Sequence, residues 1–356
     1  MEKYKYSMAL TQQFKHCGNP FRIDTYKGCD FGCSYCFANC RGGNLNKRLQ
    51  IADFEIIENN FKKAFEDKKE TKNITIEMLR HKVPLHLGGM SDPFQSRESE
   101  YKITYKLLEL TKKYNYPMLI STKTAHIPEE YFTVIDNHIH AFQISLMSMD
   151  DEYIRKFEVK TPLPSERKVF AQYLKDKGFW VGVRIQPLIK LQQAIDVVNQ
   201  LSGIVDYITV EHIKIGNDNA NKKKMFVDME LNPNDFKSCG REYEFKTDIK
   251  RENILALKSI SKCPIGCGDN DLHELSASNN CCGVDTINEN FNQWIKYNSM
   301  YINKTEDRSQ WFPQCNCSSC FNSEGRVNGW HFKDYVDDYM QHPIKEGLCK
   351  VKLDEQ

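Results

Sequence analysis

The segment CDFGCSYC places three cysteines, Cys29, Cys33 and Cys36, on one short stretch of chain. Three thiolates at such a spacing can bind three irons of a 4Fe-4S cube, and the fourth iron is then left open. An open iron can coordinate a small molecule, just as catalytic zinc sites differ from structural ones by a vacant position. The alternative is a structural zinc site that takes Cys17 or Cys40 as its fourth ligand.

The chain around this segment alternates short apolar runs with amphipathic stretches from residue 20 to about 215. We expect strands at 21–26, 83–87, 117–121, 141–146, 180–186 and 207–211, and helices near 52–68, 99–115, 128–137, 164–177 and 190–202. Repeated strand–helix–strand order predicts a parallel sheet, because parallel neighbours need crossover connections. The expected fold is α/β, a partial (βα)6 TIM-like barrel with a C-terminal cysteine-rich extension, and its chemistry lies at the carboxyl ends of the strands.

Two domains are expected, a barrel over residues 1–220 and a cysteine-rich module over residues 221–356. The lysines at 222–224 and the NPND turn at 232–235 suggest a linker, and a charged stretch with a helical pattern follows them.

Composition narrows the class of protein. The 356 residues include 49 basic and 48 acidic side chains, so the net charge of +1 provides no overall attraction for nucleic acid or anionic lipid. The sequence shows neither a signal peptide nor a long apolar run, so we expect a cytoplasmic protein that does not bind membranes. In a reducing compartment, 14 cysteines indicate metal or redox sites rather than disulfides.

The CxxxCxxC pattern with the aromatic Tyr35 before its last cysteine resembles the signature of radical S-adenosylmethionine (radical SAM) enzymes. The resemblance implies that the open iron binds S-adenosylmethionine, which is reductively cleaved to a 5′-deoxyadenosyl radical that abstracts hydrogen from a substrate. It also implies a reducing electron donor such as flavodoxin or ferredoxin. Further segments are similar to the spore photoproduct lyase and DNA repair photolyase-like branch, namely GGMSDPFQ at 88–95, ISTKTAHI at 120–127, ISLMS at 144–148, FEVKTPLPSER at 157–167 and VGVRIQPLI at 181–189.

Carried over to this sequence, the resemblance implies a set of cofactor-binding residues. The segment with Gly88, Gly89, Ser91 and Asp92 would contact the amino group of the cofactor, and the remaining contacts would come from Tyr35, Phe37, Phe94, Lys123, Ser145 and Arg184. Lys123 and Ser145 would contact the cofactor's carboxylate or ribose, and Arg184 would line the same cleft. Three alternatives stay open: Lys123 is a solvated lysine, Asp92 pairs with Arg184 or caps a turn, and Phe94 belongs to an ordinary aromatic core.

Two further expectations concern Glu158 and Gly89. Glu158 and Arg167 could simply pair with each other. Photoproduct lyases carry a hydrogen-donating cysteine at the position that we align with Gly89, which has no thiol. A close copy of their lesion-reversal chemistry is therefore not expected unless another cysteine, such as Cys17 or Cys40, takes that role.

The remaining clustered cysteines lie in the C-terminal part, at Cys263, Cys267, Cys281, Cys282, Cys315, Cys317 and Cys320. They are interleaved with Gly, Pro, Asn and Ser, so metal ligation would have to supply stability that apolar packing does not. An auxiliary 4Fe-4S cluster, structural zinc with or without His273, and free buried thiols are the three interpretations. Cys239 and Cys349 are isolated in the sequence, so we expect each of them to be a packing residue or a reactive thiol.

The sequence as a whole predicts a radical SAM enzyme whose substrate could be a nucleic-acid base, a peptide or a small metabolite. The competing hypothesis is a non-enzymatic zinc-binding interaction protein in which all of the cysteine clusters hold zinc.

Overall fold

A computed structural model describes residues 1–10, 19–39, 49–67, 69, 73–216, 219–239, 242–269, 271–278 and 280–293, together with the strands Arg326–Val327 and Trp330–His331. Cys17, Cys40, Cys315, Cys317, Cys320 and Cys349 lie outside these residues, so the expectations that concern them stay predictions.

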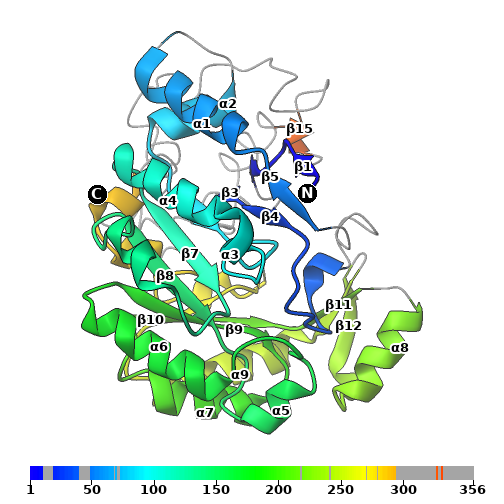
Figure 1. The fold of residues 1–356 in the computed structure, drawn as a ribbon. Helices are drawn as coiled ribbons and strands as arrows, with labels where there is room; N and C mark the ends of the chain where they lie inside the picture. The colour runs from blue at the N-terminus through cyan, green and yellow to red at the C-terminus, as the bar shows by residue number, and fades with distance from the viewer. Residues whose placement is uncertain are drawn as a thin grey trace.

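A mostly parallel sheet forms the centre of this α/β fold (Figure 1). Within the described residues its strand order is β14–β10–β9–β8–β7–β6–β3–β2, and β2 is antiparallel to β3. The strands are β2 (Met8–Leu10), β3 (Phe21–Ile23), β6 (Leu85–Leu87), β7 (Met118–Thr122), β8 (His140–Ser145), β9 (Val181–Leu188), β10 (Tyr207–His212) and β14 (Ile265–Cys267). Each of the six predicted strands overlaps one of them.

Amphipathic helices connect the strands and cover the outer face of the sheet (Figure 1). In order they are α1 (Phe54–Lys62), α2 (Ile74–Arg80), α3 (Glu98–Tyr101), α4 (Ile103–Lys113), α5 (Asp151–Arg155), α6 (Pro164–Asp176), α7 (Leu191–Leu201), α8 (Asn219–Asp228) and α9 (Thr247–Ile260). In α7 the buried side chains are Ala194, Val197, Val198 and Leu201, which recur at the spacing of one helix face. Burying such a face contributes more to helix stability than intrinsic propensity does.

The two faces of the central sheet differ in polarity. In β3, Arg22 is partly exposed between the buried Phe21 and Ile23, and His86 of β6 is partly exposed between Leu85 and Leu87. Successive side chains of a strand point to opposite faces, so the apolar residues face the helices and the polar ones face the other side. Sequence alternation therefore gives this parallel sheet one polar face, where a site can form.

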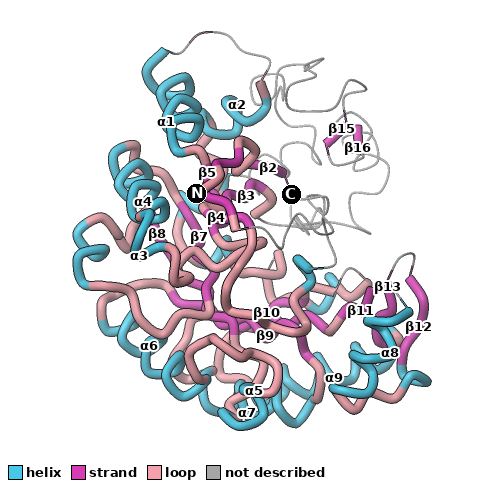
Figure 2. The backbone as a smooth tube through the Cα atoms, turned by 45° about the vertical axis from the view of Figure 1, so that its right-hand side comes forward, coloured by secondary structure: helices cyan, strands magenta, loops and turns pink. Residues whose placement is uncertain are grey.

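Two small sheets flank the central one (Figure 2). The first joins β1 (Lys3–Tyr4), β5 (Gln50–Ala52) and β4 (Tyr26–Lys27), so it ties the first residues of the chain to the segment that follows β3. The second is antiparallel and joins β11 (Lys214–Gly216), β13 (Glu242–Phe245) and β12 (Phe236–Cys239).

Part of the C-terminal region belongs to the central sheet. The lysines at 222–224 lie within α8, so the prediction of a linker at these residues was wrong, whereas Pro233–Asp235 forms a turn of 3-10 helix as the NPND motif suggested. β14 pairs in parallel with β10, so the sheet continues past residue 220. Closure into a partial barrel and the division into two domains stay predictions.

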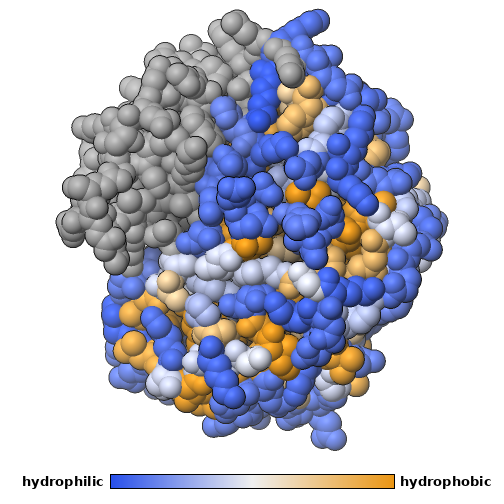
Figure 3. All heavy atoms as spheres, turned by 90° about the vertical axis from the view of Figure 1, so that its left-hand side faces the viewer, coloured by the Kyte–Doolittle hydropathy of each residue, from blue (hydrophilic) through white to orange (hydrophobic). Residues whose placement is uncertain are grey.

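No helix among the described residues has both the length and the apolar character needed to cross a bilayer. Figure 3 shows hydrophilic residues over much of one face of the molecule, with hydrophobic residues gathered in separate groups.

Gly88, just after β6, provides a test of this packing. Its φ is +87°, and an added Cβ would lie 2.2 Å from the backbone oxygen of Ser121. Gly88→Ala should therefore lower the free energy of unfolding by about 2 kcal/mol or more, measured by urea denaturation. Gly89→Ala is the matched control, because its Cβ would meet only Arg22 Cδ at 3.9 Å. Equal stability of the two variants would contradict the described packing.

Candidate active site

The cysteine loop leaves the sheet just after β3 and β4 and is held by a second segment, residues 157–160. Gly28 precedes Cys29 with φ of +80°, which lets the chain turn away from the strand. Cys33 forms an antiparallel bridge with Glu158, and Ser34 N–H donates to Phe157 O at 2.9 Å. The loop is therefore fixed by backbone hydrogen bonds before any cofactor binds.

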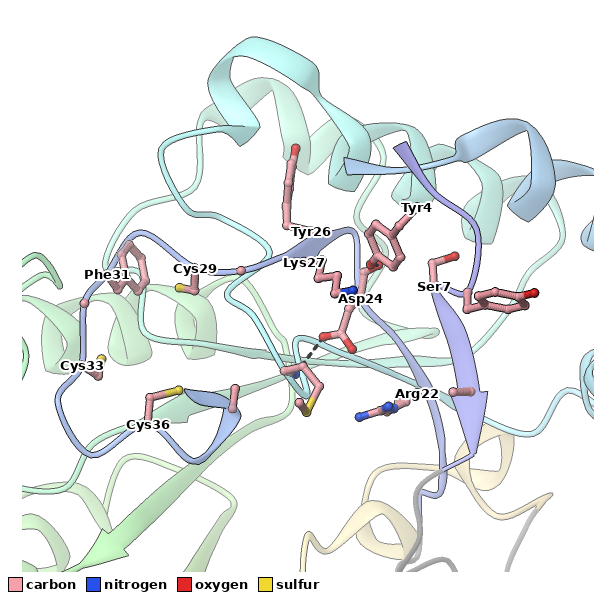
Figure 4. A pocket seen from close by; sticks show the side chains of 16 residues that line it. Tyr4, Ser7, Arg22, Asp24, Tyr26, Lys27, Cys29, Phe31, Cys33 and Cys36 are labelled. Atoms are coloured by element: carbon pink, nitrogen blue, oxygen red, sulfur yellow. Dashed lines mark hydrogen bonds between the residues drawn. The ribbon is translucent and has the colours of Figure 1, made fainter. Parts of the chain in front are cut away.

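All three thiols of this loop line one cavity of about 260 Å³ (Figure 4). The opposite wall comes from the N-terminal segment and β3, whose Arg22 has its guanidinium turned toward the cysteine loop. The full lining is Tyr4, Tyr6, Ser7, Ala9, Arg22, Asp24, Tyr26, Lys27, Gly28, Cys29, Phe31, Gly32, Cys33, Cys36, Ala38 and Met90. Cys29, Cys33 and Cys36 thus line the same cavity.

The environment of Cys29 and Cys33 raises the pKa of both thiols and so favours their protonated form. Burial raises the pKa of Cys29 to about 12, with a further contribution from the charge of Asp92. Burial likewise raises the pKa of Cys33 to about 12, although Lys123 acts in the opposite direction. Among the described residues, no three or more His, Cys, Asp or Glu side chains gather tightly enough to hold a single metal ion. A group larger than one metal ion is therefore needed to contact all three thiols in this cavity.

Glu158 lies at the centre of a buried ionic network behind the loop. Its carboxylate accepts hydrogen bonds from Lys123 Nζ at 2.9 Å and from Thr161 Oγ1 at 3.0 Å. It also accepts short bonds from Tyr35 Oη and Arg167 Nη2. Burial alone would raise the pKa of Glu158, but Lys123 and Arg167 outweigh it and lower the value to about 2.

This network changes the interpretation of three residues. Glu158 and Arg167 pair, as expected. Lys123 is not a solvated lysine, because it contacts both Glu158 and the Tyr35 hydroxyl, which lies 3.0 Å from its Nζ. The Tyr35 ring is buried, and its hydroxyl points into the network.

The segment after β6 is fixed by its own hydrogen bonds. Asp92 accepts from Thr122 Oγ1 at 2.9 Å and from the backbone N–H groups of Lys123 at 2.6 Å and Phe94 at 2.9 Å. Of the two alternatives for Asp92, the structure thus shows the turn cap rather than a pair with Arg184. Ser91 Oγ donates to the backbone oxygen of Tyr26, and Met90 N–H donates to Asp24 Oδ1 at 2.8 Å.

The other predicted contacts are distributed along the sheet. Arg184 Nη2 donates to Glu211 Oε2 at 2.6 Å, and Lys214 pairs with the same carboxylate at 2.9 Å. Ser145 contributes its backbone oxygen to Arg167 at 2.9 Å. The Phe94 ring packs edge-on against the Tyr131 ring, with 6.0 Å between the ring centroids, which supports the aromatic-core alternative for Phe94. Phe37 is 38% exposed.

Four of the clustered C-terminal cysteines lie within the described residues, in β14 and in the segments just before and after it. Cys267 is buried in β14, with Sγ 3.9 Å from the backbone oxygen of Asp269, and Cys282 Sγ lies 3.3 Å from Asn280 Oδ1. Cys263 and Cys281 are partly buried against the main core. The described residues give no support for a second metal site at these cysteines.

Sequence analysis missed the wall of the cavity that faces the cysteines. Arg22 and Asp24 lie within a predicted strand, and the polar–apolar alternation of FRID could have marked them as facing away from the core. Burial raises the pKa of Asp24, although Arg22 and the N–H groups of Met90 and Ser91 oppose this rise. The cavity therefore places a cation, a buried carboxyl and three thiols around one space.

A family model matches the part of the chain that forms this site. The model of the Radical SAM superfamily matches residues 23–191, which contain the cysteine loop and the segments that surround it. Residues 23–191 thus match a radical SAM domain. Members of this superfamily use a 4Fe-4S cluster and S-adenosylmethionine.

Solved structures show the same fold. A spore photoproduct lyase variant superposes with a TM-score of 0.54 at 14% sequence identity and covers 72% of this chain and 78% of that chain. A second variant, with bound AdoMet and dinucleoside spore photoproduct, has a TM-score of 0.52 at 14% identity and covers 72% of this chain and 77% of that chain.

Relatives in sequence include uncharacterized proteins of Mycobacterium bovis and Mycobacterium tuberculosis. They are 23% identical over 198 residues, which is 52% of this chain and 55% of theirs. The chain thus spans about half the length of these relatives.

Glu158→Gln tests the ionic network of the radical SAM domain. The substitution leaves Lys123 and Arg167 without their buried counter-charge, so the free energy of unfolding at pH 7 should fall by about 3–5 kcal/mol. The pKa of Glu158 is lowered in the folded state, so its stabilisation is present above the ordinary value of 4.5 and is lost as the pH falls toward about 2. The stability difference between wild type and variant should therefore shrink over this range, measured by chemical denaturation.

Glu130→Gln is the matched control, because Glu130 pairs with Lys102 on the exposed surface. It should change stability little at any pH. If Glu158→Gln changed the free energy of unfolding as little as this control, the predicted contribution of the network to stability would be contradicted.

Proposed function

We propose that the chain binds a 4Fe-4S cluster through Cys29, Cys33 and Cys36 and uses S-adenosylmethionine to abstract hydrogen from a substrate. The bound cluster and cofactor would supply reductive cleavage and a 5′-deoxyadenosyl radical. The observation that carries the proposal is the cavity that all three thiols share within a radical SAM domain. A reducing partner such as flavodoxin or ferredoxin would deliver the electron, and the expected location is the cytoplasm.

The residues around the cysteines would position the cofactor rather than react with it. Asp92 and Ser91 fix the backbone of residues 88–94, so the polar groups of that backbone, at Gly88, Gly89 and Met90, are held in place for the cofactor's amino group. Lys123 would act mainly by holding Tyr35 and the loop, since Glu158 already neutralises its charge. Ser145, Phe37 and Arg184 remain candidates for contacts with the ribose, the adenine and the substrate.

Two observations bear on the substrate. One structural neighbour binds a dinucleoside spore photoproduct, and the cavity of this chain carries Arg22 and Lys27 together with Tyr6, which is 89% exposed. These features favour a nucleic-acid base over a peptide or a small metabolite. Gly89 still lacks a thiol, so we do not extend lesion reversal by a cysteine at that position to this chain.

Anaerobic reconstitution with iron and sulfide tests the proposal. We expect a brown protein with absorbance near 400 nm that converts S-adenosylmethionine to 5′-deoxyadenosine when dithionite is added. The Cys29→Ala, Cys33→Ala and Cys36→Ala variants should lose this turnover, whereas Cys239→Ala, which changes an exposed thiol, should keep it. A colourless protein that binds zinc and shows no turnover would favour the zinc-binding interaction protein instead.

Counting iron tests the predicted auxiliary cluster, or zinc, in residues 221–356. The triple variant Cys29→Ala, Cys33→Ala, Cys36→Ala should retain iron and sulfide if Cys263, Cys267, Cys281, Cys282, Cys315, Cys317 or Cys320 hold a second cluster. Zinc in this variant, measured by elemental analysis, would assign the module to structural zinc. Loss of all metal would refute both predictions.

A further inference from the structure

A chain of hydrogen bonds crosses the polar face of the central sheet. His86 Nε2 lies 2.7 Å from Ser121 Oγ, and Ser121 Oγ lies 3.3 Å from Gln143 Oε1. Gln143 Nε2 lies 3.3 Å from Thr209 Oγ1, and Thr209 Oγ1 lies 2.8 Å from the backbone oxygen of Cys281. The chain thus runs through β6, β7, β8 and β10 and ends on the loop that follows β14.

The carbonyl end fixes the direction of every bond in this chain. A carbonyl oxygen only accepts, so Thr209 must donate its proton to Cys281 O and can then only accept from the Gln143 amide. The Gln143 oxygen consequently accepts from Ser121, whose single proton is then used. Ser121 Oγ can therefore only accept from His86, so the proton of the His86 ring lies on Nε2.

His86 is neutral in this arrangement. Burial lowers its pKa to about 3, and the positive charges of Arg184 and Arg22 act in the same direction. A neutral ring with its proton on Nε2 has a bare lone pair on Nδ1. Nδ1 makes no hydrogen bond with any described residue, although the side chain is partly exposed.

His140 shows that the unused nitrogen is not a general consequence of burial. Burial also lowers the pKa of His140 to about 3, despite the opposing charge of Asp136. Both of its nitrogens are used, because Nδ1 accepts from Asp136 N–H at 2.9 Å and Nε2 lies 3.0 Å from Thr111 Oγ1. Both ring nitrogens of His140 therefore have hydrogen-bond partners, whereas among the described residues only Nε2 of His86 has one.

Arg22 lies beside His86. The two residues are partners in the parallel pairing of β3 with β6, so their side chains project from the same face. Arg22 makes no hydrogen bond or ion pair with the residues that the structure describes, and its side chain lines the cavity that holds the three cysteines (Figure 4). A strong donor and a fixed acceptor therefore lie next to each other near the thiols.

We propose that His86 and Arg22 determine substrate specificity by binding the lactam edge of a nucleobase, with His86 Nδ1 accepting from the ring N–H and Arg22 donating to the adjacent carbonyl oxygen. Ser121, Gln143 and Thr209 are positioning residues that hold the tautomer of His86. This inference rests on the proposed function, because it places the substrate beside the cavity of Cys29, Cys33 and Cys36.

The geometry of amides favours a ring lactam over a peptide bond. A trans peptide points its N–H and C=O in opposite directions, so one bond cannot satisfy a donor and an acceptor that lie side by side. A ring lactam, as in thymine, uracil or guanine, presents the two groups on one edge. An apolar substrate would leave His86 Nδ1 and the Arg22 guanidinium without hydrogen-bond partners. The free-energy cost of these unpaired groups would make the site select against such a substrate.

The tautomer can be tested without cofactor or substrate. In protein labelled with ¹⁵N-histidine, long-range correlation spectra should show His86 with a bare Nδ1 and a protonated Nε2 from pH 5 to pH 8. Thr209→Val removes the hydroxyl that orients Gln143, so it should shift His86 toward a mixture of tautomers and leave the His140 signals unchanged. A proton on Nδ1 in the wild type would overturn the proposal.

The ligand can be tested with the dinucleotide TpT and with the same compound methylated at N3 of both thymines. TpT should shift the His86 Nδ1 resonance and bind at least 10-fold more tightly than the methylated probe, because methylation removes the donor. His86→Phe should abolish this preference, and Arg22→Met should weaken TpT binding. Equal binding of the two probes, or preferential binding of an asparagine-containing peptide, would overturn the nucleobase assignment.

A second measurement separates substrate from cofactor. Equilibrium dialysis with S-adenosylmethionine should give the same affinity for reconstituted wild type and His86→Phe. An affinity loss for the cofactor, with TpT binding unchanged, would assign Nδ1 to the cofactor and overturn the proposal. Absence of 5′-deoxyadenosine formation in the wild type would instead refute the proposed function, while the tautomer and probe experiments would still report on His86.

Discussion

The arrangement of the cysteine loop depends on one buried carboxylate, that of Glu158. A carboxylate in the interior is costly unless charges and hydrogen bonds replace its water shell, and here Lys123, Arg167, Thr161 and Tyr35 replace it. These partners come from the end of β7, from α6, from the segment between α5 and α6, and from the cysteine loop itself. The charge is therefore compensated only when all four segments are in place together. Such a network favours one arrangement of the loop over many similar ones.

The polarity of the central sheet shows how the fold supports chemistry. Its outer face is buried by helices, and the buried residues of β6 and β9 alternate with His86 and Arg184 on the other face. Polar groups in such a position contribute little net stability, because they exchange bonds with water for bonds with each other. Several of them bond to each other here, through the chain from His86 Nε2 to Cys281 and the pair of Arg184 with Glu211. The stability of the domain thus comes mainly from the face that the helices cover.

Much of this fold was predictable from the sequence, because strands and helices of a parallel α/β domain have distinct periodicities. The six predicted strands overlap observed ones, and the loop of Cys29, Cys33 and Cys36 follows the first of them. β14 was not predicted, because its three residues, IGC, lie in a cysteine-rich segment beyond the strand–helix alternation that marked the equally short β3 and β6. The lysines at 222–224, together with the NPND turn, suggested a linker, yet these lysines lie in α8. A short strand is thus recognised by its place in an alternating pattern rather than by its own residues.

The site was predictable in its residue types and less so in their partners. Spacing marked the three cysteines, but nothing in the sequence shows that Lys123 contacts Glu158 or that Arg184 contacts Glu211, since these partners lie 35 and 27 positions away. His86 carried no signal at all, because a single histidine in a strand has no spacing to distinguish it. Its role follows from the direction of the hydrogen bonds that join β6, β7, β8 and β10, which only the folded sheet brings together.

The pairing of β14 with β10 also constrains how the protein is made. β10 ends at His212 and β14 begins at Ile265, so a nascent chain presents the open edge of β10 while the intervening residues leave the ribosome. An uncovered strand edge of a parallel sheet can recruit other chains, and non-local pairings form slowly. Synthesis of this protein therefore includes an interval in which the sheet is nearly complete but vulnerable to aggregation, and this interval ends only when the strand after α9 arrives.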